Sequence, residues 1–211
     1  MKTDALIDLL ARGAGPAPRA VAARRLLPAV AIGLLASVLL AVSMLGAVPR
    51  EMFATPAPWI KLVYAGALAL AAGWLTARLS RPIARLSAPS RSTLAVLAAM
   101  VALGLSAWWA TPVAERADAL LGRSWVSCPW TVLALSLPSL AGVLWAVRGL
   151  APTRPRAAGF AAGLLAGAVG AFGYALSCPE PAVSFVAVWY TSGIVLTALA
   201  GAALGPRVLR W

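Results

Sequence analysis

The residues best suited to chemistry in this chain are its two cysteines, each followed at once by a proline, in SWVSCPW and LSCPEP. A deprotonated thiol is a nucleophile and a soft-metal ligand. The chain has no histidine, so Cys128, Cys178 and the nearby Glu180 form an incomplete set for a tightly held metal. A transient soft-metal contact at Cys128 and Cys178, or a redox couple between them, is easier to support than a permanent zinc site. No cofactor is implied.

Pro129 gives Cys128 a special local setting. Proline is favoured in the first turn of a helix, which places Cys128 close to the N-cap of the helix that follows. The positive end of the helix dipole stabilises a thiolate there and predicts a thiol that reacts readily. The argument is weaker for Cys178, because Glu180 opposes it. A structural disulfide is the competing interpretation, since the sequence does not give the distance between the cysteines.

The elements that position these cysteines are membrane-spanning helices. Of the 211 residues, 62% are hydrophobic and 11% are charged, which excludes an ordinary soluble domain. Helices are expected because a backbone in lipid must satisfy its own polar groups. Six apolar runs of suitable length are present: 26–48, 59–77, 93–111, 129–147, 157–176 and 182–204. The first run resembles the core of a secretory signal, but its length and the five runs after it favour a retained helix. The sequence predicts an all-α, polytopic membrane protein with six transmembrane helices.

The distribution of positive charge predicts the orientation. Fourteen of the 18 lysines and arginines fall before the first span, in the second and fourth connections, or after the sixth span. The positive-inside rule therefore places both termini in the cytoplasm, and the cysteines at the opposite, outer face. Lys61 lies just inside the second span, where we expect its long side chain to extend outward to the membrane surface. The net charge of +12 follows this topology, so we expect no direct nucleic-acid binding.

The chain divides into residues 1–25, a cytoplasmic segment; 26–206, the six-helix domain; and 207–211, a cytoplasmic tail. MKTDALIDLLARGAGPAP predicts a short amphipathic helix followed by a linker. Asp8 and Arg12 can pair at i, i+4. The residues expected to bind a partner lie on this helix: Asp4, Leu6, Ile7, Asp8, Leu9 and Leu10. The membrane surface is the alternative partner, but the two aspartates would be repelled by anionic lipid. The groove of a basic protein suits this helix better.

Several motifs together resemble one known family. They are MKTDALIDLLA, the two Cys-Pro pairs, LAPTRPR, FVAVWYTSGI and LGPRVLRW, set within six spans. This combination is similar to the NrsF family of bacterial inner-membrane anti-sigma factors, and the resemblance covers nearly the whole chain. It implies a non-enzymatic regulator that holds an extracytoplasmic-function sigma factor at the membrane. It also implies that Cys128 and Cys178 take part in sensing oxidative or heavy-metal stress, and that the amino-terminal helix binds the sigma factor.

The resemblance also implies a mechanism in which the cysteines control how the helices pack. Reaction at the cysteines would change the packing of spans four to six, where Gly159, Gly163 and Gly167 allow close helix contact. We expect these glycines to pack within one chain, and Trp189 and Tyr190 to be packing residues.

A membrane thiol oxidoreductase usually needs cysteines close in sequence, whereas here about fifty residues separate them. A small transporter would carry ionisable groups in mid-membrane, and apart from Lys61 near one edge the spans have none.

Overall fold

The computed structural model describes residues 3–13, 20–81 and 85–210, and this part of the chain is helical with no strand. Its elements are α1 (Thr3–Gly13), α2 (Val21–Leu45), η1 (Arg50–Ala54), α3 (Pro56–Leu79), α4 (Ser87–Ala110), η2 (Val113–Glu115), α5 (Arg116–Leu121), α6 (Cys128–Arg148), α7 (Pro155–Ala175), α8 (Val183–Phe185), η3 (Val186–Tyr190) and α9 (Thr191–Val208). The predicted all-α class is confirmed.

Six of these helical segments are long and apolar enough to cross a membrane: α2, α3, α4, α6, α7 and the continuous segment Val183–Val208. They overlap the six predicted spans. The largest differences are at two starts, because α2 begins at Val21 and α4 at Ser87, five and six residues earlier than predicted. Polar residues precede the apolar runs at these two places, and the helices include these residues whereas the apolar runs do not. η3 is a π-helical turn within the last segment, which hydropathy does not reveal.

Prolines and glycines set several helix boundaries. Pro56, Pro129 and Pro155 occupy the first turns of α3, α6 and α7, where a missing backbone N–H costs nothing. Gly46 ends α2 and Gly122 ends α5, both with positive φ, a conformation that side chains with a Cβ rarely adopt. Short connections between consecutive helices follow from these boundaries.

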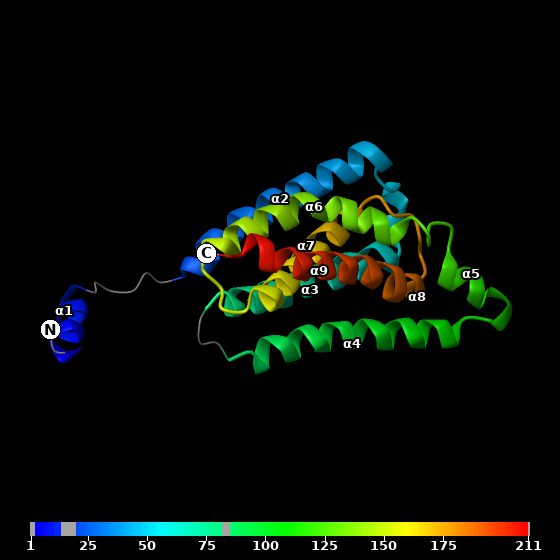
Figure 1. The fold of residues 1–211 in the computed structure, drawn as a ribbon. Coiled ribbons are helices and arrows are strands. Elements are labelled where there is room, and N and C mark those ends of the chain that lie inside the picture. Colours follow the sequence, from blue (N-terminus) through cyan, green and yellow to red (C-terminus); the bar gives the residue numbers. More distant parts are fainter. Residues whose placement is uncertain (1–2, 14–19, 82–84, 211) are drawn as a thin grey trace.

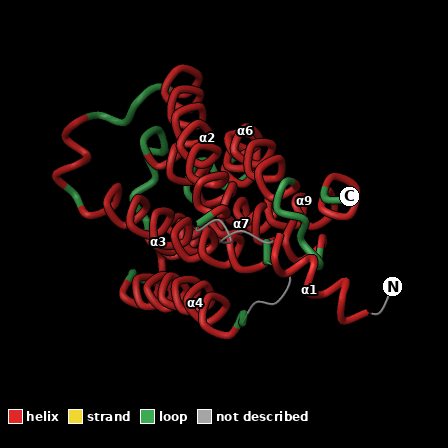
Figure 2. Tube along the Cα trace, turned by 90° about the vertical axis from the view of Figure 1, so that its left-hand side faces the viewer, coloured by secondary structure: helices red, strands yellow, loops and turns green. Residues whose placement is uncertain are grey.

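Helix α7 is the centre of the bundle (Figure 1). From Ala158 to Ala175, every residue except Phe160 and Phe172 is buried. Helices α2, α3, α6 and α9 all pack against α7, and α4 lies outermost, on α3 and the α8–η3 segment (Figure 2). The small residues of α7 allow its neighbours to come close on every side.

The three predicted glycines of α7 pack within the chain, against α9. A Cβ at Gly159 would overlap the Gly201 carbonyl oxygen, and a Cβ at Gly163 would overlap the Thr197 carbonyl oxygen. A Cβ at Gly167 would lie 3.0 Å from the Cα and the carbonyl oxygen of Ile194, which is also a close contact. The two backbones are therefore in direct contact, and the predicted intramolecular packing is confirmed. We call this contact the α7–α9 seam.

Helix α1 carries the predicted i, i+4 pair, with Arg12 Nη2 and Asp8 Oδ2 3.6 Å apart. Ile7 and Leu10 are exposed. The side chains of Leu6 and Leu9, and residues 14–19 of the predicted linker, lie outside the described residues.

Candidate functional site

The two cysteines lie at one end of the bundle, which we call the cysteine end. Cys128 is the first residue of α6, directly after Ser127 at the N-cap position, and Cys178 lies in the loop between α7 and α8. Both thiols are free, belong to the same buried cluster and are close enough to interact electrostatically. The fold therefore brings together two residues that are fifty positions apart in the chain.

Both cysteines are buried, Cys128 with 0% and Cys178 with 1% of its surface exposed. We expected Cys128 to be a readily reacting helix cap, and its burial limits access to the thiol. Tyr174, on α7, and Tyr190, on η3, belong to the same buried cluster as the two thiols. A reagent reaches either sulfur only when the cysteine end opens locally.

Lys61 lies inside the bundle, contrary to the prediction from the sequence. We expected its side chain to extend outward to the membrane surface, but Lys61 is fully buried, and its Nζ donates a 2.7 Å hydrogen bond to the carbonyl oxygen of Cys178. Its ammonium group also lies within electrostatic range of Cys128 and Glu180. Burying an ammonium group is costly unless it has partners. Lys61 thus ties α3 to the loop that carries Cys178.

Two tyrosines form an aromatic wall beside the cysteines. The rings of Tyr174, on α7, and Tyr190, on η3, lie 5.4 Å apart, and Lys61 Nζ is 6.0 Å from the centroid of the Tyr190 ring. Tyr190 is wholly buried, and its hydroxyl has no hydrogen-bond partner among the described residues. Tyr190 is a packing residue, as expected.

Glu180 closes the site from the loop side. Its Oε1 accepts hydrogen bonds from the backbone N–H groups of Arg123 and Ser124, at 2.8 and 3.1 Å, and from Ser124 Oγ at 3.1 Å. The backbone N–H of Cys128 donates to the Ser124 carbonyl at 2.8 Å. The same carboxylate that we expected to oppose a reactive Cys178 therefore fixes the turn that leads into Cys128.

Helix α5 forms a further layer over this end of the bundle. Ser184 Oγ donates to the Ala119 carbonyl at 3.0 Å, and Trp189 Nε1 donates to the Leu120 carbonyl at 2.8 Å. The Trp189 ring packs against Trp125 with centroids 5.3 Å apart. Trp189 is therefore also a packing residue. Helix α5 was not predicted from the sequence, because its six residues are too few to give a clear helical pattern.

The site offers two thiols, an amine, a carboxylate and phenolic hydroxyls. Two thiols can lose two electrons and two protons to an oxidant to form a disulfide, or can share a soft metal ion. Among residues 3–13, 20–81 and 85–210, no cluster of three or more histidine, cysteine, aspartate or glutamate side chains could hold a metal ion.

Of the residues expected to bind a partner, Asp4, Ile7, Asp8 and Leu10 are exposed on α1.

Comparison with known proteins agrees along the whole chain. Residues 10–211 match the family model "NrsF: Negative regulator of sigma F". Two relatives are each 40% identical over their full length and over all of this chain: a probable anti-sigma-F factor NrsF from Azospira oryzae and an anti-sigma-F factor NrsF from Caulobacter vibrioides. No solved structure matches. The chain therefore belongs to the NrsF family, the negative regulators of sigma F.

Proposed function

We propose that this protein is a membrane-bound anti-sigma factor that holds an extracytoplasmic-function sigma factor and releases it when Cys128 and Cys178 react with an oxidant or a heavy metal. The observation that carries the proposal is the full-length similarity to two anti-sigma-F factors. The protein would lie in the bacterial inner membrane with both termini in the cytoplasm, as the distribution of positive charge favours.

Helix α1 is the proposed docking element for the sigma factor. Eleven residues make a marginal helix in water, so its apolar side chains are best stabilised by a partner. Ile7 and Leu10 are exposed, and Asp4 and Asp8 add negative charge beside them. An apolar face with acidic flanks suits a hydrophobic groove with a basic rim.

The cysteine end is the proposed sensor. A disulfide between Cys128 and Cys178 would transfer two electrons to the oxidant and release two protons, and a soft metal would displace the thiol protons. Either event would require the thiols to move relative to Lys61 and Tyr190. Because these residues come from α3, α6, η3 and the α7–α8 loop, the change would alter how four segments pack.

The α7–α9 seam is the proposed path to the other end of the bundle. Its backbones are in direct contact, so a shift of α7 at the cysteine end cannot be absorbed by flexible side chains along the seam. Helix α7 and the continuous segment of α8, η3 and α9 both extend between the two ends of the bundle (Figure 1). A displacement at the cysteine end would therefore appear at the opposite end of the bundle, where α2 begins.

Co-purification with candidate sigma factors tests the docking element. We expect a variant that lacks residues 1–12 to lose the sigma factor. We also expect the double variant Ile7→Ser/Leu10→Ser to lose it, because the apolar side chains would bury the contact area. The matched control, Ala5→Ser/Ala11→Ser, introduces the same two hydroxyls on the same helix and should retain the sigma factor. Retention by the truncated protein would contradict the role of α1.

Transcription of the sigma-dependent genes tests the sensor. We expect Cys128→Ser and Cys178→Ser to repress these genes normally at rest and to abolish their induction by peroxide or cadmium. Ser177→Ala is the control, because Ser177 precedes Cys178 and its hydroxyl has no hydrogen-bond partner in the part of the chain that the structure describes. Unchanged induction in the cysteine variants would remove the thiols from sensing and leave the anti-sigma role intact.

A further inference from the structure

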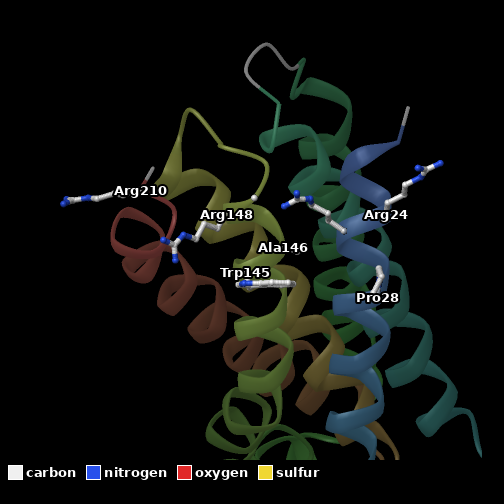
Figure 3. Close-up of a pocket in the computed structure, with 8 residues that line it drawn as sticks. Arg24, Pro28, Trp145, Ala146, Arg148 and Arg210 are labelled. Atoms are coloured by element: carbon white, nitrogen blue, oxygen red, sulfur yellow. The ribbon is translucent and has the colours of Figure 1, made fainter. Parts of the chain in front are cut away.

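A cluster of arginines surrounds a cavity at the end of the bundle opposite the cysteines. The cavity has a volume of about 670 Å³ and lies between the start of α2 and the end of α6. Four arginines line it: Arg24, Arg25, Arg148 and Arg210. Figure 3 shows Arg24 on one flank and Arg148 and Arg210 on the other, with the Trp145 ring one turn deeper along α6. We call this feature the arginine pocket.

The positive charge of the arginine pocket is not balanced by the protein in the part of the chain that the structure describes. There the one ion pair joins Arg12 to Asp8 on α1. The remaining acidic residues, Glu51, Glu115, Asp118 and Glu180, belong to the connections that precede α3, α6 and α8, at the cysteine end. Guanidinium groups without a carboxylate partner are suited to bind an anion, and their planar, forked geometry matches phosphate oxygens.

Below the arginines, the same surface becomes apolar. On α2, Ile32 and Leu35 follow Pro28 at i+4 and i+7, and both are exposed. On α6, Leu137 lies two turns before Trp145 and is exposed, and Trp145 itself has 78% of its surface exposed. Tryptophan is favoured where the headgroups of a bilayer meet the hydrocarbon. The pocket therefore offers cationic groups at the helix ends and an apolar strip that continues along two neighbouring helices.

We propose that the arginine pocket binds the phosphate headgroup of an anionic phospholipid, with Arg25 and Arg148 on the phosphate and the acyl chains along the strip of Ile32, Leu35 and Leu137. The charge and the apolar strip together favour an amphiphilic anion. An acidic protein segment would use the charge but would leave the strip uncovered. Basic pockets between transmembrane helices are a known type of anionic-lipid site.

Gly149 supports the position of Arg25. A Cβ at Gly149 would overlap the Arg25 guanidinium group, so the absence of a side chain leaves the space that this group fills. Arg25 from α2 thus reaches across to the end of α6. Replacing Gly149 with alanine would displace the Arg25 guanidinium group without changing the charge of the protein.

Native mass spectrometry of the full chain in detergent tests the proposal, with phosphatidylglycerol added to delipidated protein. We expect Arg25→Gln/Arg148→Gln to weaken the binding of phosphatidylglycerol by roughly 25-fold, since each of the two arginines near a headgroup contributes roughly fivefold. The control Arg91→Gln/Arg156→Gln removes two exposed arginines from the starts of α4 and α7, at the same end, and should bind as the wild type does. Gly149→Ala should also weaken binding.

Three outcomes would overturn the proposal. Equal loss in the test and control double variants would mean that net charge alone attracts the lipid. Displacement of phosphatidylglycerol by an equal concentration of inorganic phosphate would assign the pocket to a free anion. Unchanged lipid binding in Arg25→Gln/Arg148→Gln, with loss of the co-purified sigma factor, would assign it to an acidic protein surface.

Discussion

At the scale of single residues, Lys61 holds the Cys178 loop in place. Its ammonium group makes one hydrogen bond, to the Cys178 carbonyl, inside the buried cysteine end. The sequence placed Lys61 near the outer end of a span but not beside Cys178, because that contact joins residues 117 positions apart. A hydropathy pattern describes one span at a time and carries no information about which helices are neighbours. The two cysteines could be identified from residue type alone, but their burial could not.

We predict that Lys61→Met speeds the alkylation of Cys178 by a maleimide. A hydrogen bond to a charged group contributes about 1.5–3 kcal/mol, so its loss should make local opening on the order of ten times more frequent. The measurement is the rate of thiol labelling in a Cys128→Ser background. Tyr64→Phe is the control, because it removes the 2.7 Å hydrogen bond between Tyr64 and Thr191 without touching the loop. An unchanged or slower rate in Lys61→Met would contradict this role.

We also predict that Glu180→Ala destabilises the protein more than Glu180→Gln does. Alanine leaves the backbone N–H groups of Arg123 and Ser124 without their acceptor, whereas the glutamine side-chain oxygen can still accept from both. The expected difference is about 1–3 kcal/mol in the free energy of unfolding. Thermal unfolding in detergent measures it, and equal melting temperatures for the two variants would show that the turn before Cys128 is held by other contacts.

At the scale of elements, hydropathy was sufficient to find the six long helices and insufficient to pair them. Length and apolar content mark a span wherever it packs, which is why all six were predicted. The spacing of Gly159, Gly163 and Gly167 indicated a close contact, but not that α9 is the partner. Helix α5 and η3 depend on tertiary contacts, such as the hydrogen bonds from Ser184 and Trp189 to the α5 backbone. No local sequence pattern therefore predicts these two elements.

The α7–α9 seam gives a prediction at this scale. Gly163→Ala should destabilise the bundle by about 1–3 kcal/mol, because its Cβ would overlap the Thr197 carbonyl oxygen of a backbone that cannot move aside. Gly73→Ala in α3 is the control, since its Cβ would meet only a Leu165 methyl group at 3.7 Å. That change should be neutral or slightly stabilising. Thermal unfolding distinguishes the two, and an equal effect would mean that the seam adjusts freely.

At the scale of the whole molecule, the two ends of the bundle differ in chemistry, and the membrane orientation decides what each end meets. The cysteine end carries Glu51, Glu115, Asp118 and Glu180, and the opposite end carries the arginine pocket. If the arginines face the cytoplasm, the cysteines face the oxidising periplasm, where disulfides form. The sensing proposal requires this orientation for an outside signal, while the arginine pocket requires only a leaflet with anionic lipid.

We predict that Ala54→Cys is labelled by a membrane-impermeant maleimide in intact cells, and that Thr153→Cys is labelled only after the inner membrane is permeabilised. Both positions are exposed, and they lie in connections at opposite ends of the bundle: Ala54 is the last residue of η1, and Thr153 lies between α6 and α7. A Cys128→Ser/Cys178→Ser background leaves a single thiol in each variant. The reverse labelling pattern would place the cysteines in the reducing cytoplasm and the start of α2, which follows α1 in the chain, outside. Both the sensing of an external oxidant and the docking of a cytoplasmic sigma factor on α1 would then be wrong together, because both depend on the one orientation.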